Sequence, residues 1–285
     1  MGAAPDIRVD HHVFSAFGGS RCEIAAAGDL GVDAVSAAVA DVYAFEQRLS
    51  RFRPDSELSL LNAGGGKAMA ISPLLEAVLR AAITAWELSD GLVDAAVLPA
   101  LVAAGYDVSI EEVRRRDADG CARGTATRGA CPVLPDALEI GDGWARVRPG
   151  CAVDLGGIGK GWLADRLAER LGDAAVSLGG DVRILGDGPE GRGWTVELCD
   201  GSRIVAGDAG VATSGTEGRR WGAGRHHLID PRSGRPAATD VAAVSVVAAD
   251  AASAETLAKA AAILGSVAGV AYAHERGAAR VAVRR

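Results

Sequence analysis

Apolar residues recur at helical spacing in two segments of the N-terminal third of the chain. The first segment covers residues 33–49, where the apolar positions, three or four residues apart, are Val35, Val39, Val42, Phe45 and Leu49. This spacing places them on one face of a helix. The second segment begins with Ser72-Pro73, because serine caps a first turn and proline fits the first helical position. We expect this helix to run to about Leu88, where Asp90-Gly91 stops it.

Short apolar and β-branched runs next to glycine-rich turns predict strands in the second half of the chain. The clearest is a hairpin from residues 138–140 to residues 144–147 across Gly141-Asp142-Gly143. Further strand-like runs are predicted at residues 152–155, 174–181 with 182–185, 194–198 and 241–247, with helices at 161–171 and 253–264. Because the strands and helices do not alternate in a regular βα repeat, the sequence predicts an α+β fold.

The middle of the chain lacks this regularity. Residues 94–104 form a further apolar segment that contains Pro99, whereas residues 111–136 are rich in Arg, Asp, Gly and Pro. We interpret residues 111–136 as a surface connection. A length of 285 residues allows about two domains. We expect one domain over residues 1–285 with a possible seam near 111–136.

Composition and charge exclude several functional classes. Hydrophobic residues make up 49% of the chain, charged residues make up 24%, and the net charge is −7. These values are typical of a globular protein without the basic surface that nucleic acid needs. The five cysteines are irregularly spaced and never form CxxC, which indicates neither a disulfide framework nor a zinc site. No apolar run approaches about 18 residues, and the first eight residues lack a signal-peptide core. We therefore expect a cytoplasmic protein with no membrane segment and no nucleic-acid partner.

Two glycine-rich loops resemble known phosphate-binding patterns to different degrees. Residues 153–161 place Asp154, several glycines and Lys160 directly before a predicted helix, where exposed N–H groups and the helix dipole favour an anion. The spacing differs from a P-loop, which would need glycine at position 154 and Ser or Thr at position 161. Residues 186–191 formally fit GxGxxG, but Pro189 lies inside the motif and a strand follows. A hairpin loop is the better interpretation there.

Residues 227–236 form a third loop, in which Pro231 and Gly234 fix the backbone around polar side chains. His227 is the best candidate for a general base by its titration range. Upstream, Thr213-Ser214-Gly215 offers hydroxyl and N–H groups to phosphate oxygens. Each residue taken alone could equally be a solvated, capping or turn residue. Their coexistence in one chain favours a site for phosphoryl transfer to or from a phosphate-containing ligand.

Six motifs, taken in order, resemble the FAD:protein FMN transferase family, also called ApbE. They are residues 49–62 (LSRFRPDSELSLLN), 93–99 (VDAAVLP), 153–161 (VDLGGIGKG), 178–181 (LGGD), 212–215 (ATSG) and 227–236 (HLIDPRSGRP). The resemblance implies an α+β fold of mixed sheets with flanking helices and a flavin cleft between two halves. It also implies an enzyme that binds FAD and, with magnesium, moves the FMN half onto a threonine hydroxyl of an acceptor flavoprotein, releasing AMP.

The resemblance and the residue patterns together assign candidate roles. The general base would be His227 or an acid such as Asp181. Contacts to the flavin cofactor would come from Phe17, Phe52, Ala104, Gly105, Tyr106, Asp154, Lys160, Ser214, Ile229 and Lys259. The carbonyl of Gly157 and the carboxylate of Glu255 would face the metal.

The chain departs from the family in its last predicted helix. Family members carry Ala-Asp followed four residues later by Thr, whereas this chain has Ala254-Glu255 and then Lys259. Glu255 keeps a carboxylate for magnesium, but a protonated lysine cannot bind a metal. Lys259 would form either an i,i+4 salt bridge with Glu255 or a contact with the diphosphate in place of the metal. The departure puts magnesium in doubt, and it keeps a non-catalytic FAD-binding protein or an FAD pyrophosphatase as alternative functions.

Overall fold

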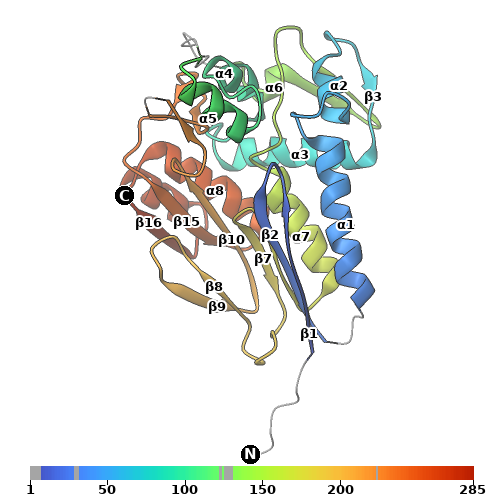
Figure 1. The fold of residues 1–285 in the computed structure, drawn as a ribbon, viewed down its shortest axis with the longest axis vertical. Coiled ribbons are helices and arrows are strands. Elements are labelled where there is room, and N and C mark those ends of the chain that lie inside the picture. Colours follow the sequence, from blue (N-terminus) through green and yellow to red (C-terminus); the bar gives the residue numbers. More distant parts are fainter. Residues whose placement is uncertain (1–7, 29–31, 122–123, 125–130, 223) are drawn as a thin grey trace, which may run out of the picture.

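A seven-stranded sheet forms the centre of the molecule (Figure 1). The computed structural model describes residues 8–28, 32–121, 124, 131–222 and 224–285. In spatial order the strands are β1 (Val9–Ala16), β2 (Ser20–Ala27), β6 (Ala174–Leu178), β7 (Asp181–Leu185), β10 (Asp208–Gly215), β15 (Ala243–Ala248) and β16 (Arg280–Arg284). Each neighbouring pair is antiparallel. The turn from β6 to β7, the end of β10 and the start of β15 therefore meet at one end of the sheet.

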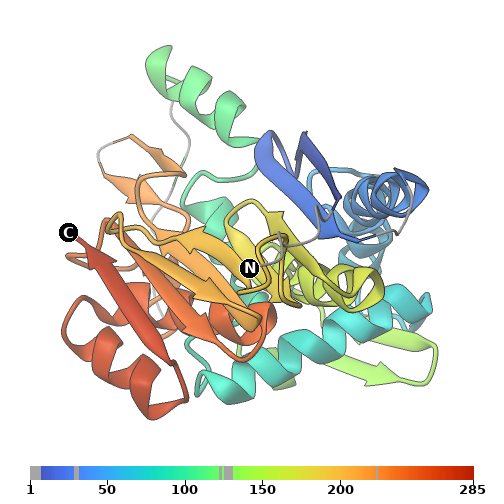
Figure 2. The same cartoon turned by 90° about the horizontal axis from the view of Figure 1, so that it is seen from below.

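Helices pack against one face of this sheet in two layers. The inner helices are α1 (Val32–Leu49), α7 (Gly159–Leu171), α8 (Ala251–Leu264) and α9 (Ala268–Glu275). α7 packs on β6 and β7, and α8 packs on β10 and β15. Figure 2 shows α3 (Pro73–Leu88) on the outer side of α7 and α8, which it contacts. The apolar stripes of these helices and the inner face of the sheet form the main core.

The opposite face of the sheet is covered by a two-stranded sheet of β8 (Trp194–Glu197) and β9 (Arg203–Ala206). Trp194 packs there in a smaller core with Ile184 and Val211. Its indole N–H donates to the Asp173 carboxylate at 2.9 Å. Because side chains alternate along a strand, Ile184 faces this small core while Asp181 and Arg183 face the helices.

The remaining elements lie above the end of the sheet where β6 turns into β7 (Figure 1). They are α2 (Glu57–Asn62), β3 (Met69–Ala70), the 3-10 helix η1 (Ala95–Val97), α4 (Leu98–Ala103), α5 (Ile110–Ala118), α6 (Leu134–Ala137), β4 (Leu138–Gly141), β5 (Trp144–Val147), β11 (Arg220–Trp221), β12 (Arg225–His226), β13 (Ile229–Asp230) and β14 (Arg235–Pro236). β3, β5 and β4 form a small sheet, and β11–β12 and β13–β14 are short hairpins.

Most predicted elements form, and the α+β fold is confirmed. The two N-terminal helices begin and end within one residue of their expected bounds, and Ser72 caps the second by accepting the N–H of Leu75 at 3.1 Å. The hairpin across Gly141-Asp142-Gly143 is β4–β5. No helix in the described part of the chain combines the length and the apolar character that crossing a membrane requires.

Residues 152–155 do not form the predicted strand. Their backbone groups are bonded elsewhere: the side-chain amide of Asn62 bonds both the N–H and the carbonyl of Val153, at 2.8 and 2.9 Å, and the N–H of Asp154 donates to the Ala95 carbonyl at 2.8 Å. These hydrogen bonds stabilise an irregular segment. A buried backbone N–H or carbonyl group needs a hydrogen-bond partner, and that partner does not have to be a neighbouring strand.

The prediction of a hairpin loop at residues 186–191 is also wrong in its pairing. These residues join β7 to β8, but β7 lies between β6 and β10, so neither of its edges is free for β8. β8 pairs with β9 instead.

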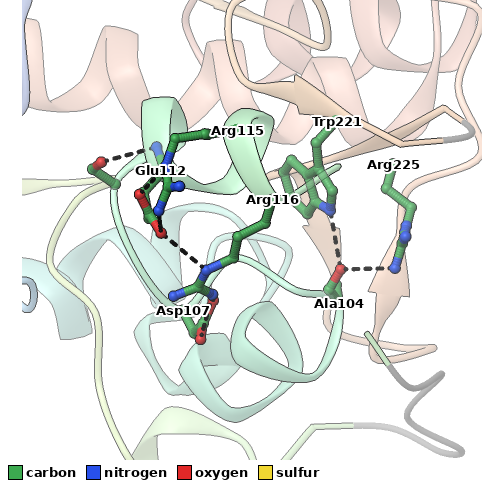
Figure 3. A network of polar contacts seen from close by, with 8 residues as sticks. Ala104, Asp107, Glu112, Arg115, Arg116, Trp221 and Arg225 are labelled. Atoms are coloured by element: carbon green, nitrogen blue, oxygen red, sulfur yellow. Dashed lines mark hydrogen bonds and ion pairs between the residues drawn. The ribbon is translucent and has the colours of Figure 1, made fainter. Parts of the chain in front are cut away.

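The interpretation of residues 111–136 as a surface connection is wrong for its first part. Residues 110–118 form α5, capped by the Ser109 hydroxyl, which accepts the N–H of Glu112 at 3.3 Å. Glu112 also bonds Arg115 and Arg116 one turn later (Figure 3). Such pairs support a short, polar helix that propensity alone would not predict. Residues 122–123 and 125–130 lie outside the described residues, as do residues 1–7, and the domain seam stays a prediction.

Candidate active site

A cleft of about 620 Å³ opens at the end of the sheet where β6 turns into β7 and β10 ends. Of the predicted site residues, Tyr106, Asp154, Gly157, Lys160, Asp181, Ser214, His227, Ile229, Glu255 and Lys259 line it. Two further hollows, of about 90 and 400 Å³, share Tyr106 and Arg219 with the cleft and are lined by Phe17 and Phe52. The cleft alone is in the size range of a site for a cofactor.

The floor of the cleft is a buried cluster of one lysine and two carboxylates. Lys160 Nζ donates to Asp181 Oδ2, and it donates to Glu255 Oε1 at 2.8 Å. The second oxygen of Glu255 accepts the N–H of Gly161 at 3.0 Å. Glu255 is 2% exposed and Asp181 4% exposed, and such charges are tolerated inside a protein only when they are paired.

Three elements bring this cluster together. Lys160 and Gly161 lie in the first turn of α7, Glu255 lies on α8, and Asp181 is the first residue of β7. A Cβ atom on Gly161 would lie 2.7 Å from the carbonyl oxygen of Ala251, so glycine is what allows the beginning of α7 to approach the beginning of α8. Asp165 joins the same two helices further along, since its carboxylate accepts the N–H groups of Ala251 and Ala252 at 2.8 and 3.0 Å.

The charges in the cluster shift one another's pKa values. Burial raises the pKa of Asp181 to about 7, and the nearby Glu255 charge adds to this although Lys160 opposes it. Burial also raises the pKa of Glu255, but Lys160 and Lys259 outweigh it and the net shift is downward. Burial lowers the pKa of Lys160, yet Asp181 and Glu255 hold the net value above its usual range. Lys160 is therefore a fixed cation.

Lys259 lies one helical turn after Glu255 and does not form the i,i+4 salt bridge that was one of its two predicted roles. No ion pair or hydrogen bond joins it to any residue that the structure describes, because the oxygens of Glu255 are bonded to Lys160 and Gly161. Its ammonium lies against Gly157, where a Cβ atom would be 1.6 Å from Nζ. Burial lowers the pKa of Lys259, although Glu255 opposes this shift.

The residues at this position do not fit the magnesium ion that the family resemblance implies. Divalent magnesium needs oxygen ligands in octahedral geometry, whereas the Glu255 oxygens are bonded and an ammonium lies at Gly157. Among the described residues, no group of three or more His, Cys, Asp or Glu side chains is arranged to hold a metal ion.

Aromatic side chains and an arginine line the hollows next to the cleft. The Arg51 guanidinium lies 4.0 Å from the Phe52 ring centre and 4.6 Å from that of Tyr106. Arg51 Nε is 3.4 Å from Asp154 Oδ2. Phe17 has a φ of 53° at the turn from β1 to β2, which directs its ring beside Phe45, at 6.3 Å between ring centres. Phe17 and Phe52 are partly exposed, and flat rings of this kind suit stacking on a planar ligand, whereas Tyr106 and Phe45 are buried.

Ala104 and Gly105 do not line the cleft, unlike their neighbour Tyr106. Figure 3 shows Trp221 and Arg225 directed at the Ala104 carbonyl, to which they donate at 3.1 and 3.4 Å. Gly105 has a φ of 100°, which favours glycine and turns the chain toward Tyr106. In this structure the two residues hold a turn against β11–β12.

His227 enters the cleft from the segment between β12 and β13. Burial lowers its pKa well below the usual 6.5, and Arg219 and Lys259 add to the shift. Its Nδ1 is buried and has no hydrogen-bond partner within the described ranges. Asp230 in the following hairpin bonds Arg232 at 2.8 Å and shapes the turn instead of lining the cleft. The imidazole is therefore neutral, as a general base must be.

Several polar cleft residues, among them Arg219, Ser20 and Asp94, were not predicted as site residues from the sequence. Arg219 lines the cleft and both hollows, and its backbone is hydrogen-bonded to His227. Ser20 and Asp94 line the cleft as well, and Asp94 also caps η1 by accepting the N–H of Ala96 at 2.7 Å. Asp94 lies within a recognised motif, but the sequence around Arg219 gives no comparable signal.

The α+β fold carries a cleft of cofactor size that is lined by both basic and acidic side chains, and comparisons with known proteins identify the family. The model of the ApbE family matches residues 18–283, so the chain belongs to the ApbE family. The FAD:protein FMN transferase of Treponema pallidum is 30% identical over 289 aligned positions, covering 87% of this chain and 76% of that protein. The FAD:protein FMN transferase of Klebsiella pneumoniae is 33% identical over 123 residues, which is 36% of each chain.

Solved structures agree with the fold. The flavinyl transferase ApbE of Pseudomonas stutzeri, in its apo form, superposes with a TM-score of 0.80 at 22% identity, covering 98% of this chain and 92% of that one. The ApbE protein of Thermotoga maritima gives a TM-score of 0.80 at 23% identity, covering 96% and 94%. The ApbE-like fold predicted from the sequence is confirmed.

Proposed function

We propose that this protein is an FAD:protein FMN transferase that moves FMN from FAD onto a threonine hydroxyl of an acceptor protein. Membership of the ApbE family and relatives that bear this name support the transferase activity. The observation that carries the proposal is the cleft, in which fixed cations, a neutral imidazole and an adjoining aromatic hollow face one space. A dinucleotide with a planar ring at one end and a diphosphate in the middle matches this distribution.

The proposed reaction is a single phosphoryl transfer. The threonine oxygen of the acceptor attacks the phosphorus of the FMN half, a new P–O bond forms, and the bond to the bridging oxygen of the diphosphate breaks so that AMP leaves. His227 takes the hydroxyl proton. Lys160, Lys259 and Arg219 stabilise the negative charge of the phosphates, and Ser214 donates to a phosphate oxygen. The rings of Phe17, Phe52 and Tyr106 hold the flavin.

The alternative functions have less support. A non-catalytic FAD-binding protein or an FAD pyrophosphatase would use the same cleft, but the relatives carry the transferase name. A cytoplasmic location remains a proposal from the sequence.

The transferase proposal predicts a gain of one FMN on an acceptor domain that carries a threonine in the family's acceptor motif. The purified full chain would be incubated with FAD in magnesium-containing buffer, and the intact mass of the acceptor would be measured. We expect the gain with FAD and none with FMN, which lacks the AMP leaving group. An acceptor whose threonine is replaced by valine is the control. FAD binding without any mass gain would count against the transferase and in favour of the binding-only alternative.

The pH profile of transfer is expected to separate the two candidate bases. Activity falls when the base becomes protonated, so the midpoint of the acidic limb of kcat/KM reports its pKa in the free enzyme. We expect this midpoint below 6.5, because burial lowers the pKa of His227. A midpoint near 7 would assign the base to Asp181, whose pKa burial raises to about 7.

A further inference from the structure

Lys259 lines the cleft and has no hydrogen-bond or ion-pair partner among the described residues. It extends from α8 to the loop before α7, where its ammonium lies against Gly157. The neighbouring cation Lys160 is bonded to two carboxylates, whereas the part of the chain that the structure describes offers Lys259 no hydrogen bond or ion pair. An ammonium carries three donors and no acceptor. Its hydrogen-bonding capacity is therefore available to a ligand.

The three carboxylates that line this part of the cleft are already engaged. Glu255 is bonded to Lys160 and to the N–H of Gly161, and Asp181 is bonded to Lys160. Asp154 accepts the N–H of Gly156 at 2.9 Å with one oxygen and lies 3.4 Å from Arg51 Nε with the other. A divalent cation bound here would compete with these contacts for the carboxylate oxygens, and the Lys259 ammonium would repel it. The donor set favours an anionic ligand over a metal.

We infer that the Lys259 ammonium occupies the position of a divalent cation at the diphosphate of bound FAD, so that this chain binds FAD without magnesium. The inference rests on the proposed function for the identity of the ligand. In this arrangement Nζ donates to non-bridging oxygens of the diphosphate. Glu255 keeps Lys160 in place beneath it, and Glu255 does not act as a metal ligand.

Binding to the wild-type chain is the direct test. FAD affinity is measured by quenching of flavin fluorescence in EDTA and again in excess magnesium. We expect the two dissociation constants to agree within about twofold. Isothermal titration of magnesium into the FAD complex is expected to give no binding heat attributable to a site. An FAD affinity that falls tenfold or more in EDTA overturns the inference.

A charge-removing variant tests whether Lys259 supplies the cation. Lys259→Met keeps the length of the side chain and is expected to weaken FAD binding about 10- to 100-fold in EDTA, the range for one charge-assisted contact. Riboflavin, which lacks the diphosphate, should bind the variant and the wild type equally. The matched control is Lys67→Met, since Lys67 is an exposed lysine that does not line the cleft. Equal loss for FAD and riboflavin would mean a general disruption and would contradict the inference.

The double variant Glu255→Asp/Lys259→Thr tests the converse. Without the ammonium and with a shorter carboxylate, we expect FAD binding that is weak in EDTA and restored at least tenfold by magnesium. An FAD affinity of this variant that magnesium leaves unchanged would count against the inference. These experiments measure FAD binding and not FMN transfer. If no FMN is transferred to an acceptor, the proposed function is contradicted. FAD binding that persists in EDTA would still support the role of Lys259.

Discussion

Replacement of Lys160 by methionine is expected to lower the free energy of unfolding by about 3–5 kcal/mol, the usual cost of removing one partner from a buried ion pair. Lys160 is the hydrogen-bonded cation of both Asp181 and Glu255, which are almost fully buried. Methionine fills the space without the charge. The variant therefore isolates the loss of pairing from the loss of volume.

Urea denaturation followed by circular dichroism would measure this loss. Lys67→Met, at an exposed position, should stay within about 0.5 kcal/mol of the wild type. Adding Asp181→Asn and Glu255→Gln to Lys160→Met should recover part of the stability, because neutral side chains no longer carry unpaired charge. A loss below about 1 kcal/mol for Lys160→Met would show that the cluster is hydrated and not buried as described.

The pH dependence of this loss has a definite sign. Without Lys160, burial and the Glu255 charge raise the folded pKa of Asp181 further above its unfolded value of 3.8, and Glu255 loses the largest of the contacts that lower its pKa. At pH values between the unfolded-state pKa and the folded-state pKa, the folded state of the variant binds more protons than the unfolded state. The free energy of unfolding of the variant therefore falls as the pH rises. The difference between the variant and the wild type should be smaller at pH 4.5 than at pH 8.

Replacement of His227 by alanine is expected to reduce kcat/KM for FMN transfer about 10²- to 10⁴-fold, the usual contribution of a general base. The dissociation constant for FAD should change by only about threefold, because a neutral imidazole adds little to the attraction of the phosphates. Transfer would be followed by the intact mass of the acceptor in single-turnover reactions, and FAD affinity by fluorescence.

His11→Ala provides the matched control for this variant. His11 is exposed on β1, bonded to Glu23 at 2.8 Å and absent from the cleft. We expect it to transfer FMN at the wild-type rate. Activity within tenfold of the wild type in His227→Ala, combined with a large loss in Asp181→Asn, would assign proton removal to Asp181.

The sequence predicts those parts of the fold that depend on local patterns. Helical spacing and the Ser72-Pro73 start signal give two long helices, and glycine-bounded runs give most strands. The errors have long-range causes. The backbone of Val153 is hydrogen-bonded by the side chain of Asn62, which lies 91 positions away in the sequence. A pattern of neighbouring residues cannot predict such a distant partner.

The candidate site shows the same division. The glycine-rich loop before α7 and the residues of the family motifs lie at the cleft, as their composition suggests. The pairing of Glu255 with Lys160 and Gly161, and not with Lys259, depends on how closely α7 approaches α8. Arg219 is positioned by a short segment after β10 with no recognisable pattern, so only the structure relates it to the cleft.

The link between α7 and α8 has a consequence for how the site is prepared. Asp165 joins the two helices through the N–H groups of Ala251 and Ala252, and Lys160 joins them again through Glu255. Packing of α7 against α8 during folding therefore also orients Lys160 in the cleft, before any ligand binds. The incoming dinucleotide therefore meets dipoles and charges that need little rearrangement, which keeps the reorganisation energy of the transfer step low. Evolutionary change at the packing contact would alter catalysis without touching a group that contacts the substrate.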